Sequence, residues 1–201
     1  MVVLPVSKSV DVERLRAARA AGITALGENR VQEASVKQAE LPDVSWHLVG
    51  HLQSNKAGRA VELFETIHSV DSIDLARRLD RIAAAAGRVP LPVYLEVNVD
   101  RDPAKTGMDA ADLERALPDL AALHGLELRG LMTVGRLVED PEDARPTFAA
   151  LRKVSERLRA HQPRLGHGMS MGMSDDFEIA VEEGATVVRV GRAIFGARPP
   201  G

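Results

Sequence analysis

Short apolar runs alternate along the chain with stretches whose apolar residues are spaced for one face of a helix. The first run, Val2–Val6, is mostly β-branched and is typical of a strand that is buried on both faces. A helix pattern follows, which Asp11 can cap and Gly22 can end. Similar apolar runs recur near residues 23–26, 46–49, 66–70, 92–99, 126–133, 167–171 and 186–190, with a turn expected at residues 27–29.

Strands in regular alternation with helices indicate parallel βα units with right-handed crossovers. An open doubly wound sheet has the same pattern, but eight units in a chain of 201 residues favour closure. We therefore predict an α/β fold, a single-domain (β/α)8 TIM barrel that occupies residues 1–201.

Composition narrows the classes of partner. A formal charge of -3 and an aromatic content of 3% disfavour nucleic-acid binding, and the absence of cysteine excludes disulfides and thiolate chemistry. No basic-then-apolar leader or long apolar run is present, so we expect a cytoplasmic protein with no membrane partner. No long apolar helix face stands out either, which favours a monomer.

Polar residues gather just after the predicted strands, and in a parallel barrel these joints share the face that carries function. Lys8 follows the first strand, where a lysine is badly placed for packing but can form an imine with a carbonyl compound. The alternative is a lysine that packs its stem and extends its ammonium group into water.

The joint after the seventh strand, residues 169–176, passes through a glycine into a helix start. Free backbone N–H groups and the helix dipole at such a place bind phosphate or carboxylate, and Ser170 and Ser174 can add hydroxyl donors. Gly191 lies after the eighth strand, and barrel phosphate sites are commonly built from these two loops. The alternative is that Ser174 or Asp175 only caps the helix.

Arg189 interrupts the apolar run of residues 187–190, where a guanidinium is costly without a partner or ligand. It is a candidate ligand-binding residue, or else it faces the helix layer and pairs with Glu178 or Glu182. His47 and His68 also lie in apolar runs, and we expect hydrogen-bonded histidines of the core or the site rather than metal ligands.

Six stretches of the chain resemble the YggS/PROSC family, the pyridoxal phosphate homeostasis proteins. The match runs from the first strand to the C-terminus, and two of its blocks, 46–56 and 170–175, are long and unusual. The matching stretches are Val6–Lys8, Gly27–Glu33, Trp46–Lys56, Ile67–Asp71, Ser170–Asp175 and Val188–Gly196.

The resemblance implies a barrel like the N-terminal domain of alanine racemase, a fold type III protein that holds pyridoxal 5′-phosphate (PLP). Lys8 would form the Schiff base, and Arg189 would face the pyridine nitrogen. Asn29 and His51 would line the cofactor pocket. The residues implied to bind the phosphate are Ser170, Met171, Gly172, Ser174 and Gly191.

The implied function is PLP homeostasis, in which the protein buffers or delivers the cofactor and so affects amino-acid and keto-acid balance. PLP-dependent apo-enzymes are the candidate recipients. Little or no turnover is expected, because an arginine opposite the ring nitrogen weakens PLP as an electron sink. One alternative is a racemase-like PLP enzyme that uses Lys8 as its base, and another is a Schiff-base aldolase acting on a phosphorylated sugar.

The chain departs from the family pattern in three places. Arg30 stands where an aromatic residue is usual, and Arg192 stands where a small hydroxyl residue is common. The helix that usually precedes the first strand is missing, and we expect lower stability as a result. Lys56 and Lys105 are alternative points of attachment, the latter on a loop that could face the pocket mouth.

Overall fold

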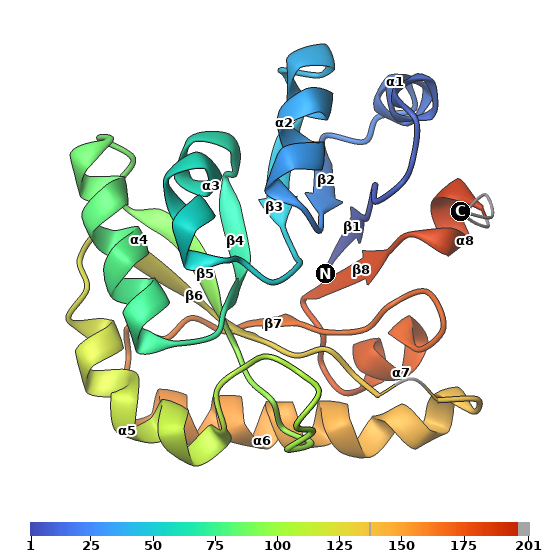
Figure 1. The fold of residues 1–201 in the computed structure, drawn as a ribbon. Coiled ribbons are helices and arrows are strands. Elements are labelled where there is room, and N and C mark those ends of the chain that lie inside the picture. The colour runs from blue at the N-terminus through green and yellow to red at the C-terminus, as the bar shows by residue number, and fades with distance from the viewer. Residues whose placement is uncertain (137, 197–201) are drawn as a thin grey trace.

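The computed structural model describes residues 1–136 and 138–196, and within them eight parallel strands form one sheet (Figure 1). Their order is β1-β8-β7-β6-β5-β4-β3-β2. A parallel bridge between Val6 and Gly27 joins β1 to β2 and closes the ring, so the predicted barrel is confirmed. The strands are β1 (Val2–Pro5), β2 (Ala25–Glu28), β3 (Ser45–Leu48), β4 (Thr66–Val70), β5 (Leu91–Glu96), β6 (Leu126–Met132), β7 (Gly168–Ser170) and β8 (Val187–Val190).

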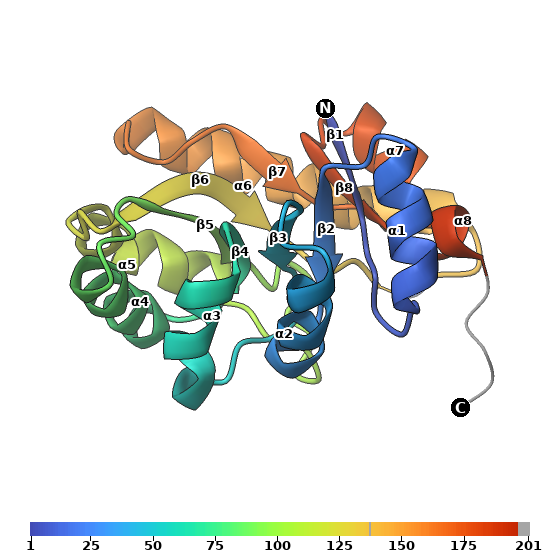
Figure 2. The same ribbon diagram turned by 90° about the horizontal axis from the view of Figure 1, so that it is seen from above.

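Helices surround the sheet on its outer side (Figure 2). Asp11, Ser72 and Asp109 cap three of them by accepting hydrogen bonds from backbone N–H groups, as their positions in the sequence predict. No helix in the described part of the chain is long and apolar enough to cross a membrane. The helices are α1 (Val12–Ala20), α2 (Val31–Glu40), α3 (Ala57–Leu63), α4 (Ile73–Ala85), α5 (Ala110–Ala121), α6 (Arg145–His161), α7 (Phe177–Glu182) and α8 (Arg192–Phe195), with 3-10 turns η1 (Ser54–Lys56) and η2 (Pro141–Ala144).

Apolar side chains fill two regions. The larger lies between the strands and the helices, and a smaller cluster contains Leu4, Val49, Tyr94, Met132 and Val187 from five different parts of the barrel. Strands that pack on both sides have no polar face, which explains their continuous apolar runs.

The second strand differs from the sequence prediction. Ala25–Glu28 is β2, so the expected turn at residues 27–29 begins later. Gly27 and Glu28 stay extended because they lie in register with His47 and Leu48 of β3. Glu28 is fully buried as a result, a position in which a carboxylate needs partners.

Candidate functional site

A cavity of about 490 Å³ opens at the carboxyl ends of the strands. This is the face on which barrel enzymes and binding proteins carry their sites, and the volume is in the range of small-molecule pockets. Its lining residues lie within β8 or shortly after the end of a strand. They are Val6, Asn29, Val49, Val134, Met173, Ser174, Asp175, Arg189, Gly191 and Arg192.

Arg189 reaches this cavity from inside the barrel. Its guanidinium donates to the carbonyl oxygen of Ser170 at 2.6 Å, to the Ser170 hydroxyl at 2.9 Å and to the carbonyl oxygen of Thr133 at 2.8 Å. Burial lowers its pKa to about 10, against the attraction of Glu96 and Asp176, so the side chain remains a cation at neutral pH.

The alternative pairing of Arg189 with the helix layer is wrong. Glu182 pairs with Arg145 at 2.5 Å, and Glu178 is exposed to solvent. Arg189 faces inward because its neighbour two residues earlier, Val187, belongs to the cluster inside the barrel, and side chains alternate along a strand.

A chain of hydrogen bonds supports Arg189 from below. His47 Nδ1 lies 3.1 Å from His68 Nε2, and His68 Nδ1 lies 2.9 Å from the Ser170 hydroxyl that Arg189 also contacts. Tyr94 stacks on His68 with ring centroids 4.4 Å apart. The expectation of hydrogen-bonded histidines is confirmed.

Both histidines are neutral in this setting. Burial lowers the pKa of His47 to about 4, and burial, with the nearby His47 and Arg189, lowers the pKa of His68 well below its usual value. Neutral rings can accept and donate in one chain, so they order Ser170 without adding charge.

The loops after β7 and β8 meet at the cavity. Gly191 N–H donates to the Ser174 hydroxyl at 3.2 Å, and both residues line the cavity. The N–H groups of Ser174 and Arg192 donate to no oxygen within the described part of the chain. Arg192 lines the same wall and pairs with Asp175. These groups form a donor surface that suits an anion.

Gly172 shapes the first of these loops. Its φ is +90°, and a Cβ there would lie 2.5 Å from the Cβ of Ala180. Only glycine fits this position, because the backbone conformation and the space both exclude a side chain.

Ser170 and Met171 do not line the cavity, in contrast to the phosphate contacts predicted for them. The Ser170 hydroxyl is occupied by His68 and Arg189, and the Met171 N–H donates to the Val187 carbonyl at 3.1 Å. Both residues are fully buried. Their place in the structure is beneath the site, where they support Arg189 and the loop.

Asn29 lines the cavity, whereas His51 lies beside it. His51 is half exposed, pairs with Asp71 at 2.9 Å and lines a neighbouring pocket of about 210 Å³ together with Asn29 and Lys56. Arg30, which replaces an aromatic residue of the family pattern, lines that neighbouring pocket too.

Lys8 is partly buried in the turn that follows β1. Val6, two residues earlier, lines the cavity and packs against the cluster inside the barrel. Lys8 itself is not among the residues that line the cavity, because the chain turns at residues 8 and 9 and the alternation of β1 ends before them. Its ammonium group makes no hydrogen bond or ion pair with the residues that the structure describes.

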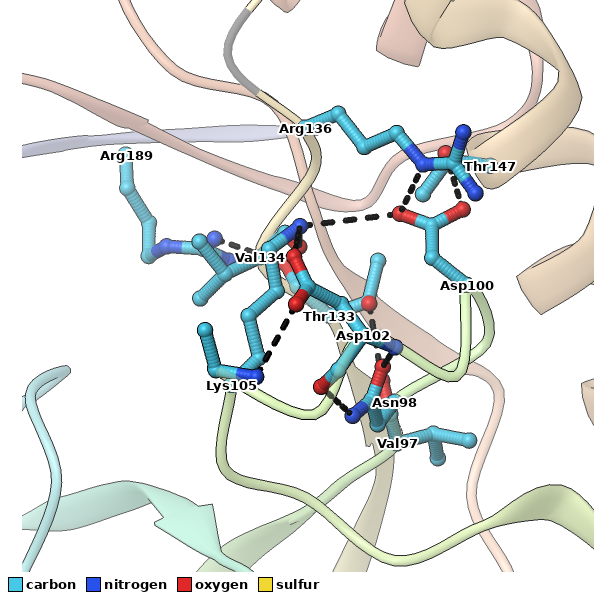
Figure 3. A network of polar contacts seen from close by, with 11 residues as sticks. Val97, Asn98, Asp100, Asp102, Lys105, Thr133, Val134, Arg136, Thr147 and Arg189 are labelled. Carbon is cyan, nitrogen blue, oxygen red and sulfur yellow. Dashed lines mark hydrogen bonds and ion pairs between the residues drawn. The ribbon is translucent and has the colours of Figure 1, made fainter.

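Lys105 lies at the rim of the cavity (Figure 3). Its ammonium group donates to the carbonyl oxygen of Val134 at 3.2 Å, and Val134 lines the cavity. Asp100 and Asp102 lie 3.6 and 3.9 Å from the same nitrogen. The loop after β5 therefore reaches the mouth of the site, as the sequence suggests for Lys105.

A buried group of charges beside Lys8 was not predicted from the sequence. Lys37 of α2 is buried and donates to carboxylate oxygens of Glu28 at 2.6 Å and Glu33 at 2.7 Å. The sequence pattern of α2 could have indicated this burial, since Lys37 lies on the same buried face of the helix as Val31 and Ala34. A charged residue on that face needs buried partners.

Comparison with known proteins shows the family of this chain. Residues 3–199 match the family model of the alanine racemase N-terminal domain. The pyridoxal phosphate homeostasis proteins of Pseudomonas aeruginosa and Aquifex aeolicus are 42% and 39% identical to this chain. Their alignments cover 98% and 97% of this chain and 85% and 86% of the relatives.

The chain belongs to the pyridoxal phosphate homeostasis protein family. The chain is also similar to two solved structures of PipY from Synechococcus elongatus, one without PLP and one with PLP bound. Their TM-scores are 0.93 and 0.91 and their identities 48% and 47%, over 98% of this chain and 93% and 92% of PipY.

Alanine racemase of Clostridium difficile shares the fold of this family at 14% identity. Its TM-score is 0.79 over 98% of this chain and 55% of the racemase. The predicted family and the alanine racemase-like barrel are thereby confirmed.

Proposed function

We propose that this protein binds PLP in the cavity described above, with Lys8 as the Schiff-base residue, and that it stores or delivers the cofactor. The observation that carries the proposal is the position of Arg189, a buried cation that lines the same cavity as Ser174 and Gly191. The relatives are named for PLP homeostasis, and PipY was solved with PLP bound.

The residues present fit such a ligand. Ser174 offers its hydroxyl and backbone N–H for a phosphate, and Arg192 offers its backbone N–H and guanidinium; Gly191 holds the Ser174 hydroxyl in place, and Gly172 shapes the loop after β7. Asn29 would line the ring, with His51 at the edge of the neighbouring pocket. Ser170 and Met171 would act from beneath by holding Arg189 and the β7 loop.

Lys8 would make the covalent link. Its nitrogen would add to the aldehyde carbon, and loss of water would leave a C=N bond in place of C=O, without any oxidant or reductant. The ammonium group must first lose a proton, and no carboxylate within the described residues holds it in an ion pair.

The positive charge of Arg189 favours storage of PLP over catalytic turnover. When bound, PLP supplies an aldehyde and a pyridine ring that can accept electrons if its nitrogen is protonated. Arg189 stays a cation and offers only donors, so facing that nitrogen it would disfavour the protonated ring. The protein would then hold the cofactor and release it to apo-enzymes.

The test is to add PLP to the purified protein, record the Schiff-base absorption band, reduce with borohydride and map the modified peptide. We expect one phosphopyridoxyl adduct, on Lys8, which Lys8→Ala removes or moves to another lysine. Lys153→Ala is the matched control, because Lys153 is exposed on α6 away from the cavity. Absence of the band, or an adduct spread over exposed lysines, would refute the site.

The racemase-like alternative has its own readout. Steady interconversion of amino-acid enantiomers by the PLP-loaded protein, abolished by Lys8→Ala, would replace storage by catalysis. A Lys8 adduct with phosphorylated sugars and no band with PLP would favour the aldolase.

A further inference from the structure

Lys8 lies in a tight turn that is unusual for its sequence. The Val10 N–H donates to the Ser7 carbonyl at 2.9 Å, and Ser9 has a φ of +61°. A positive φ at the third position of such a turn favours glycine, and serine adopts it at some cost in energy. Contacts from outside the turn must therefore hold it in place.

Those contacts come from the buried charges of β2 and α2. The Lys37 ammonium donates to the Ser7 carbonyl at 2.6 Å as well as to Glu28 and Glu33, so each of its three protons has an acceptor. Glu33 accepts a second hydrogen bond, from the Ser9 N–H, at 2.7 Å.

These two bonds fall on the two peptide groups that adjoin Lys8. The Ser7 carbonyl belongs to the peptide group before Lys8, and the Ser9 N–H belongs to the peptide group after it. Fixing both peptide planes fixes φ and ψ of Lys8 and so the direction of its Cα–Cβ bond. Among the residues that the structure describes, none forms a hydrogen bond or ion pair with the Lys8 side chain.

We infer that Glu33 and Lys37 are positioning residues that aim Lys8 at the cavity, an inference that rests on the proposed Schiff-base function. They do not touch the ligand. Glu28 completes the arrangement, because it binds Lys37 with one oxygen and the Asn29 N–H with the other, at 2.9 Å. The cluster thus links the Lys8 turn to Asn29, a residue of the cavity wall.

Glu33 is the better residue to change, because it is only partly buried whereas Glu28 is fully buried. Glu33→Ala removes the acceptor of the Ser9 N–H, and Glu33→Gln restores an oxygen there. Glu40→Ala is the matched control: the same substitution on the same helix, at an exposed residue that pairs with Arg16.

Two ligands distinguish an effect of Glu33 on the position of Lys8 from an effect on folding of the whole site. PLP can form an imine, whereas pyridoxine 5′-phosphate carries an alcohol in place of the aldehyde and can only bind non-covalently. We expect Glu33→Ala to slow Schiff-base formation with PLP at least tenfold while its Kd for pyridoxine 5′-phosphate stays within twofold of the wild type. Glu33→Gln and Glu40→Ala should form the Schiff base within threefold of the wild-type rate.

If Glu33→Ala weakens the binding of pyridoxine 5′-phosphate as much as it slows Schiff-base formation with PLP, the role of Glu33 is merely structural and the inference is overturned. If Glu33→Ala forms the Schiff base as fast as Glu40→Ala, the inference is also overturned, but the proposed function still stands. If the wild type forms no adduct on Lys8, the proposed function fails and the inference with it. Should Glu33→Ala not fold, Glu33→Asp keeps the charge but shortens the reach, and the same rate loss is required of it.

Discussion

Arg189 donates to two oxygens of a single residue, the carbonyl and the hydroxyl of Ser170, at 2.6 and 2.9 Å. His68 contacts the same hydroxyl from the other side. Arg189 is therefore held by the barrel itself, and its direction toward the cavity does not depend on a ligand.

Replacing this arginine should cost stability as well as binding. Arg189→Met removes the side-chain donor of the Thr133 carbonyl and leaves the Ser170 carbonyl with the Thr133 N–H alone, so we expect the free energy of unfolding to fall by roughly 1–3 kcal/mol. Urea denaturation measures this loss. The control is Arg59→Met, which removes an exposed pair with Glu62 and should cost about 1 kcal/mol or less. Equal effects of the two substitutions would contradict the account.

Gly172→Ala should destabilise the loop after β7. A methyl group would lie 2.5 Å from Ala180 Cβ at a φ of +90°, and such overpacking costs roughly 1–3 kcal/mol. Gly58→Ala in α3 is the opposite case, because its Cβ would meet nothing within 4 Å, and should stabilise by about 0.5–1 kcal/mol. Thermal unfolding of both variants tests the contrast, and a stable Gly172→Ala protein would argue against the loop described here.

Lys37→Met should be among the more damaging single changes. It leaves Glu28, which is fully buried, with only the Ser7 hydroxyl and the Asn29 N–H as partners. Breaking a buried ion pair from one side costs roughly 3–5 kcal/mol. Arg16→Met, which breaks the exposed pair with Glu40, should cost about 1 kcal/mol or less in the same denaturation experiment.

The stability of the protein should fall as the solution is acidified from pH 6.5 toward pH 4. The folded pKa of His47, about 4, lies below its ordinary value of 6.5, so within this window the unfolded chain binds more protons than the folded protein. The contribution of neutral His47 to the free energy of unfolding is fully present above pH 6.5 and is lost as the pH falls toward 4. His47→Asn should flatten this part of the profile, measured as urea midpoints at several pH values; an unchanged slope would count against a neutral, buried His47.

Much of the fold was predictable because the barrel buries both sides of its strands. Thr66–Val70 is a strand in sequence and structure alike, and every residue in it is buried. The cavity residues after β7 and β8 were predictable from glycine and serine at the joints. The depth of Ser170 and Met171 could not be predicted, because it depends on contacts of the Ser170 hydroxyl with His68 and Arg189 and of the Met171 N–H with the Val187 carbonyl, all distant in sequence.

The charge cluster could not be predicted in the same way. Glu28 looked like a turn residue, and its burial depends on pairing with β3, a strand that begins 17 positions later in the chain. Lys37 had the correct helical position, but nothing local identifies the Ser7 carbonyl, 30 residues away, as its acceptor. The turn at Lys8 depends on such contacts rather than on its own residues.

The cavity wall brings together the beginning and the end of the described chain. Val6 and Gly191 both line it, and a Cβ on Gly191 would lie 3.2 Å from the Val6 carbonyl oxygen. Contacts between residues so distant in sequence form late, because the intervening chain must be ordered first. During synthesis the ring could not close until β8 and Gly191 had left the ribosome, so the cavity would form only after the strands from β1 to β8 had all been made.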